Sequence, residues 1–170
     1  MRVLFTIAGL AFFSAVLGAE PIHAPAFGDF ATHEELSAHR ANVALASHPL
    51  ARNYRTVLRE AAGAKANFAG HYVIASWGCG NECVQSLLVD LNSGTVYGVV
   101  GSNEGLQSSR GIDIRLDSRL LIADPPCDDN QSCLSEALSN IPVRYYVLEE
   151  RGLRLIKEMP CHVVKGKECL

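Results

Sequence analysis

The sequence has no catalytic or cofactor motif that stands out from its background. It contains no Gly-x-Ser-x-Gly nucleophile elbow, and no paired acidic motif marks a glycosidase-type hydrolase. It also has no strong charge of one sign, because 15 Lys and Arg residues oppose 18 Asp and Glu residues to give a net charge of −3. This mild charge gives no electrostatic reason to expect nucleic acid or an anionic membrane as a partner. We therefore expect no cofactor and no nucleic-acid partner.

Long apolar runs are also scarce, and the only one lies at the start of the chain. Arg2 is followed by an almost wholly apolar run over residues 3–17, then by Gly18, Ala19 and the acidic Glu20. A basic start, a short apolar run and small exit residues are typical of a secretory signal. A helix needs about twenty apolar residues to cross a bilayer, so an uncleaved membrane anchor is the weaker alternative. We expect residues 1–19 to be a signal peptide and the mature protein to be periplasmic or secreted, with no membrane attachment after cleavage.

Cysteine is absent from the signal segment, and the six cysteines of the remaining chain form three close pairs. These pairs are Cys79 with Cys83, Cys127 with Cys133, and Cys161 with Cys169. An even number of cysteines in an exported chain predicts disulfides, although six cysteines allow fifteen pairings that sequence alone does not distinguish. The spacing favours three local bridges, and Cys127–Cys133 is the one most strongly expected because it encloses a polar loop of five residues.

Zinc is the alternative use of these cysteines. Cys79 and Cys83 are spaced like the cysteines of a structural zinc knuckle, and His71 or His162 is a candidate third ligand. A second Cys or His pair of similar spacing is missing, and an oxidising compartment favours the disulfide. We therefore expect no metal.

The rest of the chain predicts one helix followed by strands. Residues 20–47 have little periodicity and are expected to be an extended lead-in, with residues 32–40 as a candidate short helix. Apolar residues recur at helical spacing over residues 50–62, after a Ser-His-Pro start signal. Strand patterns then follow at residues 71–77, 84–91, 95–100, 112–116, 119–123, 143–149 and 153–158.

Short connections between these strands favour antiparallel pairing, because parallel pairs need crossovers of a dozen or more residues. The expected fold class is therefore mainly β (α+β). We expect residues 48–170 to form a disulfide-stapled, β-rich domain. It would consist of a single antiparallel sheet of about six or seven strands, with the N-terminal helix packed on a face or edge.

Several short motifs of this chain, taken together, resemble those of a known group of proteins. The chain contains Asn-Phe-Ala-Gly-His-Tyr at residues 67–72, Trp-Gly-Cys-Gly-Asn-Glu-Cys at 77–83 and an Asp-x-x-x-Gly hairpin at 90–94. It also contains Tyr-Arg-Thr at 54–56, Ser-Arg-Leu-Leu at 118–121 and Arg-Tyr-Tyr at 144–146. With these motifs the chain resembles a group of small exported bacterial proteins of unknown function. The resemblance spans roughly residues 48–156 and implies export to a bacterial envelope, but it implies no chemistry.

The segment around the first cysteine pair is the best candidate binding loop. Trp77 is the only tryptophan, and Asn81 and Glu82 lie between Cys79 and Cys83. His71, at the start of the preceding strand pattern, is the fourth candidate binding residue. A stapled loop beside an aromatic residue suits binding, because little entropy is lost on association. The plainer interpretation is that Trp77 belongs to the core and that the loop only connects two strands.

His71 is the one candidate for catalysis. It would act as a general base, oriented by Asp90 or Glu82, with Ser76 or Ser86 as the nucleophile. A single His in a strand is more often structural, so catalysis is not the favoured interpretation.

Three function classes therefore stay open. The leading class is a non-catalytic binding protein, an inhibitor or immunity-type partner of another envelope or extracellular protein. The alternatives are a small periplasmic hydrolase that uses His71 and a structural envelope component.

Overall fold

The computed structural model describes residues 23–126 and 141–160. The expected signal peptide and four of the six cysteines, Cys127, Cys133, Cys161 and Cys169, lie outside these residues, so the Cys127–Cys133 bridge stays a prediction. Within the described ranges, no helix has both the length and the apolar character needed to cross a membrane.

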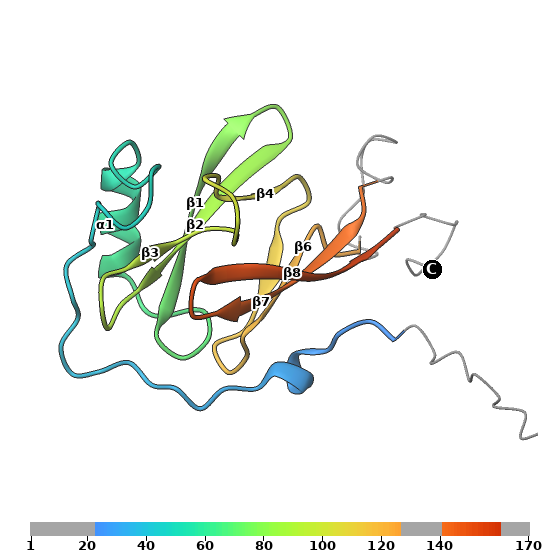
Figure 1. Cartoon of the computed structure of the whole chain (residues 1–170), viewed down its shortest axis with the longest axis horizontal. Coiled ribbons are helices and arrows are strands. Elements are labelled where there is room, and N and C mark those ends of the chain that lie inside the picture. Colours follow the sequence, from blue (N-terminus) through green and yellow to red (C-terminus); the bar gives the residue numbers. More distant parts are fainter. Residues whose placement is uncertain (1–22, 127–140, 161–170) are drawn as a thin grey trace, which may run out of the picture.

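The described part is mainly β, as expected, with one α-helix and antiparallel strand pairing (Figure 1). In chain order the elements are η1 (Phe27–Phe30, a 3-10 helix), α1 (Arg55–Gly63), β1 (Tyr72–Gly80), β2 (Cys83–Asp90), β3 (Val96–Tyr97), β4 (Leu106–Ser108), β5 (Ile112–Ile114), β6 (Leu120–Ala123), β7 (Val143–Glu149) and β8 (Gly152–Met159).

The strands form two sheets, and the expectation of a single sheet was wrong. In the first sheet β2 pairs with β1, β3 and β4, and in the second the order is β5-β6-β7-β8, so that each sheet has four strands. The physical reason lies in β2, where every residue from 85 to 90 is buried and therefore both faces of the strand are covered. Helix α1 covers one of these faces, so the second sheet is needed to cover the other.

Three apolar clusters correspond to this layering. The cluster between the sheets includes Ile74, Leu88, Leu106, Leu121, Tyr146, Leu148 and Leu153. The cluster between the first sheet and α1 includes Leu58, Val73, Leu87, Val89 and Leu91. On the outer face of the second sheet, Leu120, Val143 and Tyr145 pack with Phe27 and Phe30 of η1.

Helix α1 begins five residues later than the sequence pattern indicated. The backbone N–H of Ala51 donates to the carbonyl of His48, and that of Asn53 donates to the carbonyl of Leu50. These bonds span three residues rather than four, so the chain makes tight turns before the α-helix starts at Arg55.

Residues 23–47, which we call the strap, run along both sheets. The N–H of Thr32 donates to Asp117 O at 2.9 Å in the second half of the fold, whereas the N–H of Ala41 donates to Leu91 O at 2.9 Å in the first. The N–H of Ser37 donates to Asn92 Oδ1 at 2.8 Å. The expected helix at residues 32–40 is therefore absent, because tertiary partners satisfy backbone groups that a helix would use itself.

Candidate functional site

The β1–β2 hairpin projects beyond the neighbouring strands and ends in an exposed turn (Figure 1). All five residues from Gly78 to Glu82 are exposed, and we call them the tip. The two strands pair as far as Gly80 and Cys83, with a register shift between Gly78 and Gly80, so Asn81 and Glu82 alone form the connection. Glu82 has a φ of +50°, which places its backbone in the left-handed region.

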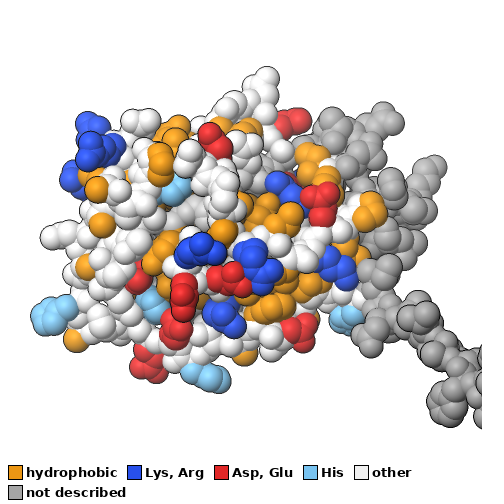
Figure 2. All heavy atoms as spheres, in the orientation of Figure 1, with side chains coloured by type: hydrophobic (Ala, Val, Ile, Leu, Met, Phe, Trp, Pro, Cys, Tyr) orange, Lys and Arg blue, Asp and Glu red, His pale blue; other side chains and the backbone are white. Residues whose placement is uncertain are grey.

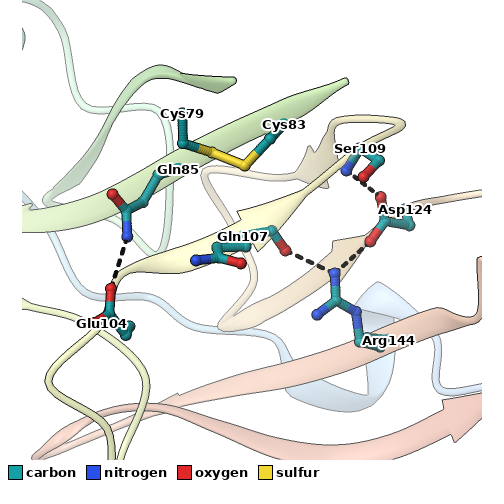
Figure 3. Close-up of a disulfide and its surroundings, with 8 residues drawn as sticks. All are labelled: Cys79, Cys83, Gln85, Glu104, Gln107, Ser109, Asp124 and Arg144. Atoms are coloured by element: carbon teal, nitrogen blue, oxygen red, sulfur yellow. Dashed lines mark hydrogen bonds and ion pairs between the residues drawn. A yellow bond between two sulfur atoms is a disulfide. The ribbon is translucent and has the colours of Figure 1, made fainter. Parts of the chain in front are cut away.

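A disulfide between Cys79 and Cys83 closes the tip, as the sequence predicted (Figure 3). Their Cα atoms are 5.2 Å apart. Closing so short a loop removes unfolded-chain entropy equivalent to about 2 kcal/mol. The bond also uses both thiols, so they are not available as zinc ligands. Within the described ranges, no group of three or more His, Cys, Asp or Glu side chains is arranged to hold a metal ion.

Trp77 lies in β1 immediately before the tip, and its side chain is not part of the exposed surface of the tip. Its ring stacks on that of Tyr54, with 3.9 Å between the centroids and 21° between the planes. It is half-buried and packs against the cluster between the first sheet and α1. The candidate contact residues of the loop are therefore Asn81 and Glu82, and Trp77 joins the hairpin to the start of α1.

His71 lies at the opposite end of β1 from the tip, between two carboxylates. Its Nε2 is 3.4 Å from Asp90 Oδ1, and its Nδ1 is 3.5 Å from Glu34 Oε2. Ser93 Oγ donates to Asp90 Oδ2 at 2.6 Å, so the turn that follows β2 holds the Asp90 carboxylate in place. Burial raises the pKa of the adjacent Tyr72 phenol, which is therefore no base at neutral pH.

The two candidate nucleophiles are not near His71. Ser76 is five residues further along β1, a distance of about 16 Å at the usual rise of a strand. Ser86 faces Ser76 across the ladder, and their hydroxyl oxygens are 2.8 Å apart. Glu82 belongs to the distant tip. Of the expected catalytic group, the structure thus brings together only His71 and Asp90.

A buried polar cluster at Asp124 was not predicted from the sequence. Asp124 is fully buried, and its Oδ1 accepts the backbone N–H groups of Ser109 at 2.6 Å and Arg110 at 2.8 Å. Its Oδ2 accepts from the guanidinium of Arg144, which also donates to Gln107 O at 2.6 Å (Figure 3).

This cluster joins the two sheets. Asp124 directly follows β6 and Arg144 lies in β7, whereas Gln107 belongs to β4 of the first sheet. The fully buried carboxylate accepts two backbone N–H groups and the Arg144 guanidinium. We therefore assign the cluster to stability rather than to ligand binding. The Arg-Tyr-Tyr motif at residues 144–146 contains Arg144, but nothing in the sequence indicates that it pairs with Asp124.

His48 is a second buried polar residue that the sequence did not single out. Its Nδ1 accepts the N–H of Leu50 at 3.2 Å, so the neutral ring carries its proton on Nε2. That Nε2 is buried and has no hydrogen-bond partner among the described residues. Burial lowers the pKa of His48, and the Glu104 carboxylate only partly opposes this effect.

We expect His48 to make the fold less stable in acid. The unfolded chain binds a proton at about the ordinary His pKa of 6.5, but the folded chain binds it only at a lower pH. Between these two values the unfolded state holds more protons, so the free energy of unfolding falls as the pH falls through this window. Urea midpoints at pH 7 and pH 5 measure the loss.

The matched variant is His48→Asn, whose side-chain oxygen can replace Nδ1 as acceptor but does not titrate. It should lose less stability between the two pH values than the wild type. An equal loss in both proteins would show that His48 does not carry this acid sensitivity.

Searches of protein-family models, of curated proteins and of solved structures found no match to this chain.

Proposed function

We propose that this chain is an exported envelope protein, periplasmic or secreted, that acts by binding another protein and not by catalysis. The partner is another envelope or extracellular protein, which it meets as an inhibitor or immunity-type protein. The observation that carries the proposal is the tip: five consecutive exposed residues at the end of a projecting hairpin, closed by the Cys79–Cys83 disulfide.

The energetic support comes from preorganisation. A loop that must be ordered on binding loses about 0.5–1.5 kcal/mol for each side chain immobilised. The disulfide fixes the tip backbone before contact, and the stacked rings of Trp77 and Tyr54 brace the strand beneath it. Asn81 and Glu82 then present an amide and a carboxylate from a backbone that is already ordered.

A hydrolase acting through His71 has less support. A nucleophile must lie within hydrogen-bond reach of its base, or one water away from it. Ser76 and Ser86 are too far along the strands, and the hydroxyl of Ser93 donates to Asp90 rather than to His71.

The double variant Asn81→Ala, Glu82→Ala should lose the partner and keep its fold. Exposed polar positions usually change stability by less than about 0.5 kcal/mol, so thermal unfolding should be nearly unchanged. Affinity capture from an envelope extract, with the partner identified by mass spectrometry, measures retention. We expect the double variant to retain less than about a tenth of the partner held by the wild type, equivalent to a loss of about 1.4 kcal/mol or more.

The control uses the second hairpin of the chain. Glu150 and Arg151 form the exposed turn between β7 and β8, without a disulfide, and replacing both with Ala should leave capture unchanged. Full retention by the folded tip variant would refute the proposed site. Absence of any specific partner for the wild type would favour a structural envelope component.

A further inference from the structure

Basic residues are concentrated around α1. Residues 40–65 contain five of the 15 basic residues of the chain but only one of its 18 acidic residues. In Figure 2, Lys and Arg side chains gather at the corner of the molecule over α1, with no acidic side chain among them on this face. Over β7 and β8, by contrast, both signs are interspersed. A chain with a net charge of −3 thus has a locally positive surface over α1.

Three arginines form this surface, and we call them the arginine face: Arg52, Arg55 and Arg59. All three are exposed, and none makes an ion pair with another described residue. Arg55 and Arg59 are four residues apart and so share one side of α1, and Arg55 donates to the carbonyl of Arg52 at 3.4 Å. The acidic Glu60 follows Arg59 and is turned away by about 100° around the helix.

The arginine face continues into a hollow at the end of α1. The hollow has a volume of about 530 Å³, and its lining includes Arg40, Asn42 and Arg59 but no carboxylate. Arg40 donates to the carbonyls of Ala62 and Ala64, so its positive charge is fixed at the end of the helix. The donors around the hollow therefore suit an anionic group.

The other end of the arginine face is linked to the hairpin that carries the tip. Tyr54, which precedes α1, stacks on Trp77 just before the tip begins. Arg52 and Arg55 flank Tyr54 in sequence, so the arginine face begins beside the residue that stacks on the strand leading into the tip. A partner seated on the tip can contact the arginine face without any change in the fold.

We propose that the arginine face binds carboxylate groups on an acidic segment of the protein partner, an inference that rests on the proposed function. Guanidinium groups pair with carboxylates through two parallel hydrogen bonds. Arg55 and Arg59 have Cβ atoms about 5–6 Å apart, and alternate side chains of an extended segment are about 6.6 Å apart. Acidic residues at alternate positions of an extended segment therefore match the spacing of the arginines.

A membrane is the less suitable anionic partner. Helices that lie in a bilayer surface combine basic residues with an exposed apolar face. The apolar face of α1 is packed on the first sheet, with Leu58 fully buried. The large exposed hydrophobic residues of the described part are Leu116 and Leu155, and neither belongs to α1 or to the strap.

The test uses a labelled oligoglutamate peptide as the probe and an oligoglutamine peptide as its neutral counterpart. We expect the wild type to bind oligoglutamate, to bind it less as salt is added, and not to bind oligoglutamine. The triple variant Arg52→Gln, Arg55→Gln, Arg59→Gln should bind oligoglutamate about tenfold or more weakly. Glutamine keeps the helix propensity of arginine, so the variant should fold.

The charge-matched control replaces three basic residues of the β7–β8 hairpin, Arg151, Arg154 and Lys157, with Gln. It should bind oligoglutamate as the wild type does. Equal weakening in both triple variants would overturn the inference, because only net charge would then matter. Arginine-dependent binding to phosphatidylglycerol vesicles without binding to oligoglutamate would also overturn it, in favour of a lipid surface.

Capture of the protein partner separates this inference from the function on which it rests. If the tip variant loses the partner while the triple arginine variant retains it, the tip remains the binding site and the inference fails. If the triple arginine variant loses the partner and the tip variant retains it, the arginine face binds and the assignment of the tip fails. Loss in both variants supports one continuous surface.

Discussion

Replacing Asp124 with Ala is expected to lower the free energy of unfolding by about 3–5 kcal/mol, the usual cost of removing one partner of a buried ion pair. The carboxylate is fully buried and accepts two backbone N–H groups as well as the Arg144 guanidinium. Without it, both N–H groups lose their acceptor and the half-buried Arg144 guanidinium loses the carboxylate with which it pairs. Asp124 also has a φ of +54°, a conformation that Asp and Asn adopt more readily than Ala.

Urea unfolding of the exported protein measures this loss, and two variants show where it comes from. Asp124→Asn keeps an acceptor oxygen and tolerance of the left-handed conformation but removes the charge, so it should lose less than Asp124→Ala. Asp113→Ala removes an exposed aspartate from β5 and should change stability by less than about 0.5 kcal/mol. A loss under about 1 kcal/mol in Asp124→Ala would mean that the cluster does not hold the sheets together.

The elements that the sequence predicted are those with strong local patterns. β1, β2, β6, β7 and β8 correspond to runs rich in β-branched, aromatic or leucine residues, and Glu150 and Arg151 separate the last two. β4 was missed because its three residues, Leu106–Ser108, lie in a polar stretch and become a strand only by pairing with β2. The division into two sheets depends on such non-local pairs, which no local pattern encodes.

The same distinction applies to the candidate site. The cysteine spacing predicted the stapled tip, because both cysteines lie within one hairpin. The stacking partner of Trp77 is Tyr54, on a different element, and the partner of Asp124 is Arg144, beyond the next connection. The catalytic hypothesis for His71 was wrong about the nucleophile. Ser76 is five residues from His71 along one strand, and a strand places residues that far apart at distant points of the sheet.

The backbone of the strap passes very close to the first sheet at two positions, and a glycine makes each close approach possible. A Cβ atom at Gly94 would lie 2.0 Å from the carbonyl oxygen of Asn42, and one at Gly70 would lie 1.9 Å from that of Glu34. Both oxygens belong to the strap backbone, which cannot yield as a flexible side chain would. Only a residue without a side chain allows the strap to pass so close to the first sheet.

Gly94→Ala should therefore lower the free energy of unfolding by about 2–4 kcal/mol, the sum of left-handed strain and a steric clash. Gly101→Ala isolates the strain: Gly101 has a φ of +81° against +78° at Gly94, but no described heavy atom lies within 4 Å of its added Cβ. Gly101→Ala should thus lose only about 1–2 kcal/mol.

Limited proteolysis should also cut the strap faster in Gly94→Ala and in Gly70→Ala than in Gly101→Ala, because only the first two displace it. Equal stability and equal cleavage in Gly94→Ala and Gly101→Ala would show that contact with the strap contributes nothing to the fold.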